Sequence, residues 1–285
     1  MRAIRALPGG THARTWLIQT ATPKLEFVLR EFPPGDNAAC AETRVLSALD
    51  GLAGLVPRLL ASGMADAPSE GSWTLISRLP GTADIRPRQP ALLAEQLGRA
   101  LARIHATPPD GLAGWHSVFD RPGGSTSAIG GPAASVVAAS WQFLTSAPAV
   151  LTHYDFWSGN VLWRDGVLTG VVDWPGGAVG PRGFDVGWCR LDLYLLHDER
   201  IAGRFLAAYE AASGSALPDP LLWDLWAAAR SYETVESWVP NYRDLGRADL
   251  TARELRRRHT AWTDDLLQDR CRRPAQIPAR PDTRP

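Results

Sequence analysis

The spacing of hydrophobic and polar residues changes along this chain, from a strand-like pattern near the N-terminus to a helical one further on. Residues 14–20 and 25–31 are rich in β-forming side chains and flank a proline-containing turn, which predicts a β-hairpin. Residues 38–49 carry apolar side chains at helical spacing and end at an Asp-Gly pair, which predicts a helix. Residues 56–60 and 72–76 predict two further strands.

From Pro90 onward the hydrophobic spacing is helical over most of the chain. Gly- and Pro-rich stretches at 111–131 and 175–181 predict loops. Two short apolar runs flank residues 164–166 (Arg-Asp-Gly), and an Asp-Gly pair in this setting predicts a second hairpin. Helices are predicted over 91–106, 132–146, 183–196, 200–213, 219–239 and 248–268.

The two patterns together predict an α+β chain of two lobes. We expect an N-terminal lobe over residues 1–80, with an antiparallel sheet and one helix, because a Pro-Gly break at its end marks a connection. A larger, mainly helical lobe is expected over residues 81–268. Residues 269–285, dominated by Arg and Pro, predict a disordered tail. A chain of 285 residues that is 45% hydrophobic can form two such lobes.

Composition narrows the range of partners. The formal net charge is +0, which gives no electrostatic reason to expect nucleic acid or an anionic membrane as a partner. Three widely spaced cysteines suit a reducing compartment. No apolar run approaches the ~20 residues that span a bilayer. We therefore expect a cytoplasmic protein with no nucleic-acid or membrane partner, and the sequence leaves its oligomeric state open.

Candidate chemistry gathers at the two ends of the second hairpin. His153, Asp155 and Asn160 precede its first strand, and Asp173 follows its second strand. Because a hairpin folds its ends together, Asn160 and Asp173 are expected side by side, with Asp155 on the adjoining loop. Two carboxylates and an amide oxygen suit Mg²⁺, and kinases carry a catalytic base and two magnesium ligands in this order. A single loop Asp or Asn is usually a turn or cap residue, so the prediction depends on the ordered set.

The expected N-terminal lobe supplies candidates for nucleotide binding. Gly9 and Gly10 permit close approach of the backbone to a phosphate, although most Gly-Gly pairs are turns. Val28 and Arg30 share one face of a predicted strand, a spacing by which kinases place an apolar residue at the adenine and a cation at the phosphates. Glu42, on the predicted helix, is placed to pair with Arg30. Taken singly, these two charges would be solvent-exposed surface residues.

The chain resembles the aminoglycoside phosphotransferase family, the small-molecule branch of the protein-kinase-like fold that includes choline kinase and homoserine kinase relatives. The resemblance covers roughly residues 7–265. It is specific at residues 152–160 (Thr-His-Tyr-Asp-Phe-Trp-Ser-Gly-Asn), 170–174 (Gly-Val-Val-Asp-Trp) and 183–187 (Gly-Phe-Asp-Val-Gly). It implies a two-lobed protein-kinase-like fold and phosphorylation of a hydroxyl group on a small molecule, with ATP and Mg²⁺ as cofactors.

The resemblance also implies roles for individual residues. By analogy with the family, Asp155 orients or deprotonates the acceptor hydroxyl, Asn160 and Asp173 bind Mg²⁺, and Asp185 braces the catalytic loop. His153 is expected to orient that loop through its ring nitrogens.

Two further residues match positions of the family pattern, and two others differ from it. Ser77 and Arg78 lie at the lobe connection, where the backbone of a two-lobed kinase hydrogen-bonds the adenine of ATP. Tyr154 stands where the family usually has Gly, and Arg30 takes the place of the usual phosphate-binding lysine. Arginine keeps the positive charge with a different geometry, and we interpret the chain as an active variant.

Two other functions stay open at this point. A catalytically impaired nucleotide-binding scaffold of the same fold is suggested by Arg30 and Tyr154. A metal-dependent hydrolase would use His153, Asp155 and Asp173, and it predicts activity without ATP.

The identity of the acceptor is less constrained. An aminoglycoside-like or amino-alcohol substrate would call for carboxylates in its pocket, whereas aromatic residues would suit a partly apolar acceptor. The candidate carboxylates are Asp192, Asp198, Glu199, Glu233 and Glu236, and the candidate aromatic residues are Trp188, Trp223, Tyr232 and Trp238.

Overall fold

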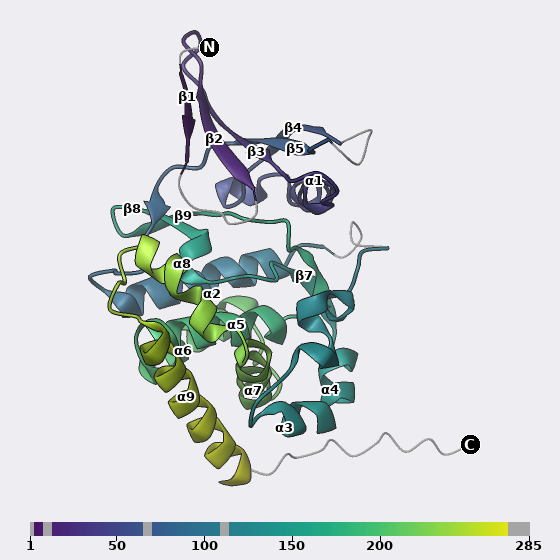
Figure 1. Cartoon of the computed structure of the whole chain (residues 1–285), viewed down its shortest axis with the longest axis vertical. Coiled ribbons are helices and arrows are strands. Elements are labelled where there is room, and N and C mark those ends of the chain that lie inside the picture. The colour runs from purple at the N-terminus through teal and green to yellow at the C-terminus, as the bar shows by residue number, and fades with distance from the viewer. Residues whose placement is uncertain (1–2, 8–12, 65–69, 109–113, 273–285) are drawn as a thin grey trace.

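A small antiparallel sheet lies above a larger body of helices in the computed structural model (Figure 1). The structure describes residues 3–7, 13–64, 70–108 and 114–272. This arrangement confirms the predicted α+β, protein-kinase-like fold.

The small sheet has five strands, and all neighbouring pairs are antiparallel. In spatial order it consists of β1 (Ala3–Ala6), β2 (Arg14–Gln19), β3 (Glu26–Glu31), β5 (Trp73–Ser77) and β4 (Leu59–Gly63). The predicted first hairpin is formed by β2 and β3, with Leu17 opposite Val28. Strand β4 begins later than the predicted residue 56, because Pro57 has no N–H to donate to the sheet.

Helix α1 (Ala38–Leu49) packs against β4 and β5 of this sheet, as Figure 1 shows. Its buried stripe includes Val45, Leu46 and Leu49. Glu42 lies one turn before Leu46, so the same stripe directs its carboxylate toward the sheet.

The helical part differs from the prediction mainly in where helices break. The predicted helix 132–146 is two helices that meet at Ser140, whose ψ of 8° leaves the helical region. The predicted helix 219–239 is also divided: its first part ends at Ser231, and a 3₁₀ turn, η7 (Val235–Trp238), follows before a new helix begins at Val239. The helices are α2 (Pro90–His105), α3 (Ala134–Ala139), α4 (Trp141–Ser146), α5 (Gly183–Leu196), α6 (Glu199–Ser213), α7 (Pro220–Ser231), α8 (Val239–Asp244) and α9 (Ala252–Arg272).

Helix α9 continues beyond residue 268, so the start of the predicted tail is wrong. Its last turn is held by Arg270, whose Nη1 lies 2.7 Å from Asp219 Oδ2, and by an ion pair of Arg272 with Asp269. These charge pairs offset the low intrinsic order of an Arg-rich segment.

A three-stranded sheet holds the predicted second hairpin. Strands β8 (Val161–Arg164) and β9 (Val167–Val171) form that hairpin, and β6 (Thr82–Ala83) adds a third strand. The hairpin turn, Asp165 and Gly166, has φ of 53° and 75°, as an Asp-Gly turn requires.

Strand β10 (Ala178–Pro181) corrects the prediction that 175–181 is only a loop. It pairs with β7 (Ala149–Thr152), and His153 follows directly after β7. Pairing with β7 overrides the loop-forming composition of this glycine-rich stretch. The predicted loop 111–131 contains three short 3₁₀ turns, η3 (Val118–Asp120), η4 (Pro122–Gly124) and η5 (Thr126–Ala128).

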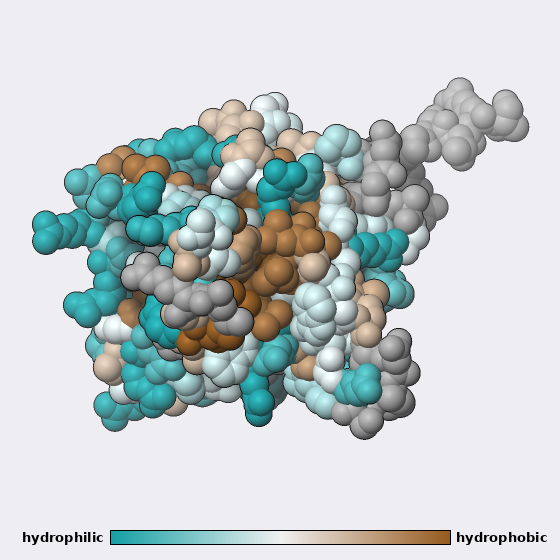
Figure 2. Space-filling view, turned by 90° about the horizontal axis from the view of Figure 1, so that it is seen from above, coloured by the Kyte–Doolittle hydropathy of each residue, from teal (hydrophilic) through white to brown (hydrophobic). Residues whose placement is uncertain are grey.

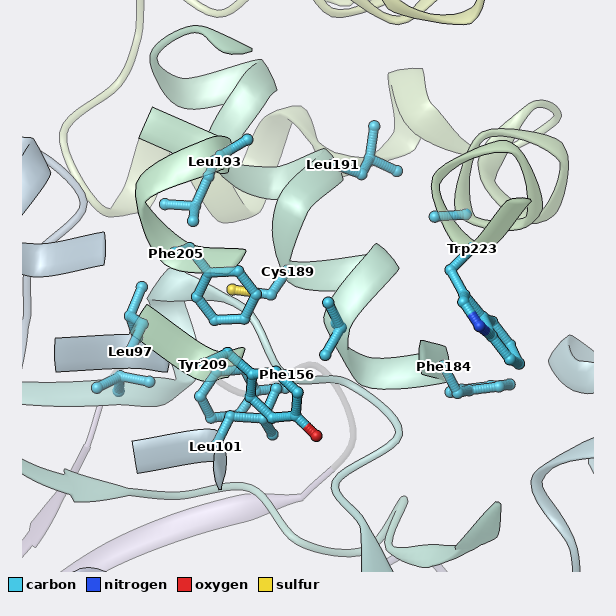
Figure 3. Packing of buried hydrophobic residues seen from close by; sticks show 14 of the residues in the cluster. Leu97, Leu101, Phe156, Phe184, Cys189, Leu191, Leu193, Phe205, Tyr209 and Trp223 are labelled. Atoms are coloured by element: carbon cyan, nitrogen blue, oxygen red, sulfur yellow. The ribbon is translucent and has the colours of Figure 1, made fainter. Parts of the chain in front are cut away.

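The main core lies among α2, α5 and α6 (Figure 3). Leu97 and Leu101 of α2 meet Cys189 of α5 and the rings of Phe205 and Tyr209 from α6, and all five side chains are buried. Burying a large apolar side chain stabilises a fold by about 1.5–3 kcal/mol, so this cluster fixes α5 firmly. Helix α5 in turn carries several residues of the candidate site.

Figure 2, seen from above, shows hydrophobic residues gathered near the centre of the face and hydrophilic ones around its edge. Within the part of the chain that the structure describes, no helix combines the length and apolar character needed to cross a membrane.

Candidate active site

The loop after β7 is fastened to the helical lobe by one carboxylate. Asp185, buried near the start of α5, accepts hydrogen bonds from the backbone N–H groups of His153 (2.6 Å) and Tyr154 (2.9 Å). His105 Nε2 donates to the same carboxylate at 3.2 Å, and its Nδ1 lies 2.8 Å from the hydroxyl of Tyr209. Asp185 therefore holds the loop in one position, and His105, at the end of α2, holds Asp185.

Tyr154 adopts the left-handed backbone conformation, with φ of 75°. This conformation costs a residue with a side chain about 1–2 kcal/mol, so the bonds to Asp185 maintain it. The turn at Tyr154 sets the direction in which the next residue, Asp155, leaves the loop.

Asp155 is held by two neutral donors. Its Oδ1 accepts from Trp188 Nε1 at 3.0 Å, and its Oδ2 accepts from Asn160 Nδ2 at 3.2 Å. Burial raises the pKa of Asp155, while the charge of His153 and the bond from Trp188 oppose that rise. The carboxylate is thus fixed in orientation and is more basic than an ordinary aspartate.

The second hairpin brings Asn160 and Asp173 to the same end. Val161 pairs with Val171, and the N–H of Val172 donates to the carbonyl of Asn160 at 2.9 Å, directly before Asp173. Asn160 uses its amide N–H groups for Asp155, and its Oδ1 accepts no hydrogen bond from the described residues. Asn160 and the partly exposed carboxylate of Asp173 therefore lie at the same end of the hairpin.

Arg30 joins the small sheet to the hairpin. Its Nη2 lies 2.5 Å from Asp173 Oδ1, and its Nη1 forms an ion pair with Glu42 of α1. Glu42, only 1% exposed, also accepts from Thr74 Oγ1 at 2.6 Å. Burial lowers the pKa of Arg30, and the combined attraction of Glu42 and Asp173 outweighs this and holds the pKa above its usual value.

The other nucleotide-side candidates are placed less specifically. Val28 is partly buried against the core. Ser77 Oγ accepts from the backbone N–H of Arg58, and Arg78 Nη2 donates to the carbonyl of Gly81, so both side chains bond to backbone. Gly9 and Gly10 lie outside the described residues.

The His153 side chain bonds to the end of the second hairpin. Its Nε2 donates to the carbonyl of Val172 at 2.9 Å, and its ring packs 4.4 Å from that of Trp174. Across the described ranges, no three His, Cys, Asp or Glu side chains converge as metal ligands. The structure therefore does not bring His153, Asp155 and Asp173 together as a set of three metal ligands within these ranges.

A cavity of about 140 Å³ opens beside Asp155. Its carboxylates are Asp155 and Asp192, and its other walls are Trp157, Trp188, Trp238, Asn241 and Tyr242. The other acceptor candidates named from the sequence do not line it: Asp198, Glu199, Trp223, Tyr232, Glu233 and Glu236.

Asp192 is the buried carboxylate of this cavity. Its Oδ2 accepts from both the N–H and the hydroxyl of Ser158, at 3.0 and 2.6 Å, and its Oδ1 accepts from the Tyr242 hydroxyl at 3.1 Å. Burial raises its pKa to about 6, despite these three bonds. Sequence reasoning grouped Asp192 with four other acidic residues. The signal that separates it is its spacing from Asp185 and Trp188, which puts all three on one face of α5.

The small lobe has an antiparallel sheet and one helix, the large lobe is mainly helical, and a hairpin carries the motif residues. This arrangement is the protein-kinase-like fold of small-molecule phosphotransferases. The chain belongs to the phosphotransferase enzyme family, whose sequence pattern matches residues 3–232. This match confirms the resemblance inferred from the motifs.

Solved structures of antibiotic kinases share this fold. Aminoglycoside phosphotransferase APH(4)-Ia is 18% identical with a TM-score of 0.61, over 92% of this chain and 93% of that one. Macrolide 2'-phosphotransferase MphH from Brachybacterium faecium is 20% identical with a TM-score of 0.58, over 92% of this chain and 91% of that one. At these identities the likeness shows the fold alone. No curated protein matches the sequence.

Proposed function

We infer that this protein transfers the γ-phosphoryl group of ATP to a hydroxyl group of a small molecule. The observation that carries this inference is the position of Asp155. On one side Asp155 lines a cavity. On the other side it accepts a hydrogen bond from Asn160, which lies at the same end of the hairpin as Asp173 and its partner Arg30. A phosphoryl donor and an alcohol bound on these two sides would meet at Asp155.

Asp155 is suited to receive the proton of the acceptor hydroxyl. Trp188 and Asn160 hold both of its oxygens, so its orientation does not depend on the substrate. Phosphoryl transfer has a loose transition state, and positioning together with charge neutralisation supplies most of the catalysis. A modest rise in the pKa of Asp155 is compatible with that role.

Asn160 and Asp173 fit a magnesium ion by the chemistry of their donors. They offer one amide oxygen and one carboxylate, and Mg²⁺ commonly binds through one or two such protein groups with phosphate and water oxygens completing its shell. When bound there, Mg²⁺ would supply neutralisation of phosphate charge. Arg30 provides a fixed cation at the same place, held by Glu42.

Other residues of the small lobe would supply the remaining contacts to the nucleotide. Val28 would pack against the adenine, and the backbone at Ser77 and Arg78 would pair with its edge. Gly9 and Gly10 would approach the phosphates. Support for nucleotide use comes from the similar fold of an APH(4)-Ia variant whose structure is a ternary complex with AMP-PNP and hygromycin B. The paired Arg30 favours an active enzyme over an impaired scaffold.

The decisive experiment replaces the proposed base. Asp155→Asn should retain AMP-PNP affinity and lose turnover by about 10²–10⁴-fold, the usual contribution of a general base. Asp165→Asn is a matched control, because Asp165 is exposed in the hairpin turn. The measurement is ADP release from Mg²⁺-ATP against a panel of hydroxylated compounds. Undiminished turnover in Asp155→Asn would remove Asp155 from the mechanism, and no turnover by the unmodified enzyme with any alcohol would contradict the function.

A further inference from the structure

Arg230 lies against the tryptophan that donates to the proposed base. Its guanidinium carbon, in the last turn of α7, is 4.1 Å from the Trp188 ring centre. The indole N–H of Trp188 is the donor to Asp155 Oδ1, at 3.0 Å. Trp188 also lines the cavity beside Asp155, and Arg230 is not among the residues that line it. One indole therefore contacts the arginine, the proposed base and the cavity.

Three further rings and one carbonyl hold Arg230 in this place. Its guanidinium carbon is 4.6, 5.0 and 5.3 Å from the ring centres of Tyr154, Phe184 and Trp226. Its Nη1 also donates to the carbonyl of Tyr154, at 3.5 Å. Trp188 is the nearest of the four rings, and tryptophan is the side chain that attracts a cation most strongly. The contact with the Trp188 indole is therefore the strongest of the four ring contacts.

Arg230 keeps its positive charge at this partly buried position. Burial lowers its pKa, whereas Tyr154, Asp155 and Asp185 oppose that fall. An uncharged side chain of similar length would cover the indole by packing alone. The guanidinium adds electrostatic attraction to the face of the ring, and this attraction favours the orientation in which the ring face meets the cation. The charge of Arg230 thus restricts how the Trp188 ring can turn.

We propose that Arg230 is a positioning residue for phosphoryl transfer, because it holds the Trp188 indole in the orientation that donates to Asp155. The inference rests on the proposed function and extends it to an arginine that acts on the base through the tryptophan. A hydrogen bond is strong only when the donor points at the acceptor, with an angle above about 150°. A rotation of the indole would therefore weaken one of the two side-chain bonds that fix the Asp155 carboxylate.

The first test follows the indole N–H of Trp188 by NMR of the full chain with ¹⁵N-labelled tryptophan, and it needs no substrate. The signal that disappears in Trp188→Phe identifies this N–H. Its exchange with solvent should be about tenfold faster in Arg230→Met than in the unmodified protein, because methionine covers the ring without the charge. Arg230→Lys should keep part of the protection, since lysine retains a cation but not the planar group that stacks on the ring.

Arg256→Met is the matched control for the exchange measurement. The guanidinium carbon of Arg256 lies 4.8 Å from the Tyr232 ring centre, so the variant removes a ring contact of the same kind. Neither Arg256 nor Tyr232 lines the cavity beside Asp155. The exchange rate of the Trp188 N–H should therefore be unchanged in this variant.

The second test is a double-mutant cycle on kcat, measured as ADP release with the hydroxyl compound that the unmodified enzyme turns over fastest. Arg230→Met and Trp188→Phe should each lower kcat about two- to tenfold, the range for one hydrogen bond. The double variant should be no slower than the slower single variant, because both changes act on the same bond to Asp155. The affinity of Arg230→Met for AMP-PNP should equal that of the unmodified enzyme.

Three results would each overturn the role of Arg230. They are exchange of the Trp188 N–H at the rate of a free indole in the unmodified protein, equal exchange rates in the unmodified protein and folded Arg230→Met, and losses of kcat that multiply in the double variant. The first does not depend on whether a variant folds. Any of them, found together with Mg²⁺-ATP turnover, would contradict only the positioning by Arg230. The expected exchange rates without any turnover would contradict only the phosphotransferase function.

Discussion

The two sides of the candidate active site hold their charges in different ways. On the proposed nucleotide side, Arg30 lies between Glu42 and Asp173, so each charge has an opposite charge in contact. On the acceptor side, Asp155 and Asp192 are held only by neutral N–H and O–H donors, with no ion pair among the described residues. The first side is electrostatically complete before a ligand binds, whereas the second is not.

This difference suggests that the two sides of the site recognise their ligands in different ways. A nucleotide needs a cation at a set position, and an internal charge network fixes that cation whether or not ligand is present. Carboxylates that are held by neutral donors, as Asp192 is, leave room for a ligand group to change the charge balance, so their side of the site is suited to select the ligand. The three predictions below test this contrast, in order of decreasing effect.

The largest effect is expected from breaking the charge network. Arg30→Met leaves Glu42 buried without a cation, which should lower the free energy of unfolding by about 3–5 kcal/mol. Adding Glu42→Gln should recover part of that loss. Chemical denaturation measures both. Arg58→Met removes a pair with Asp50 whose side chains are 66% and 77% exposed, and it should cost less than about 1 kcal/mol. Equal losses in Arg30→Met and Arg58→Met would refute the network.

A smaller effect is expected from Asp192, and it depends on pH. Burial raises its pKa from 3.8 to about 6, so between these values the folded protein binds more protons than the unfolded chain. Stability should therefore fall as the pH rises through this window, by about 3 kcal/mol in total. Asp192→Asn should lack this part of the pH dependence, as denaturation at pH 4 and pH 7 would reveal. Parallel profiles for the two proteins would contradict the assignment.

The smallest effect is expected from one hydrogen bond to the proposed base. Trp188→Phe keeps a ring against Arg230 but removes the N–H donor to Asp155, so the pKa of Asp155 should rise further. The acid limb of kcat should move to higher pH, and turnover at neutral pH should fall about two- to tenfold, the range for one hydrogen bond. Trp238→Phe changes another wall of the same cavity and should leave that limb in place.

The sequence was most informative where function depends on residues close together in the chain. The hairpin follows from an Asp-Gly turn between two apolar runs, and its register then places Asn160 next to Asp173. Glu42 follows from helical spacing, because the stripe that buries Leu46 also turns Glu42 to the sheet.

Sequence reasoning was weakest where distant helices meet. Arg230 and Tyr242 reach the site from α7 and α8, and no local pattern distinguishes them from other residues of those helices. The contact of His105 with Asp185 depends on how α2 and α5 pack, and no local pattern indicates it. Strand β10 was missed because only pairing with β7 gives that glycine-rich stretch an extended form.

The bonds that Asp185 accepts decide which lobe carries the proposed base. His153 and Tyr154 are tied by their amides to the same helix that the core holds, so the base travels with the large lobe as one rigid body. The N–H of Val171, at the end of β9, donates to the carbonyl of Leu55 at 2.8 Å, so the hairpin that carries Asp173 is bonded to the small lobe as well.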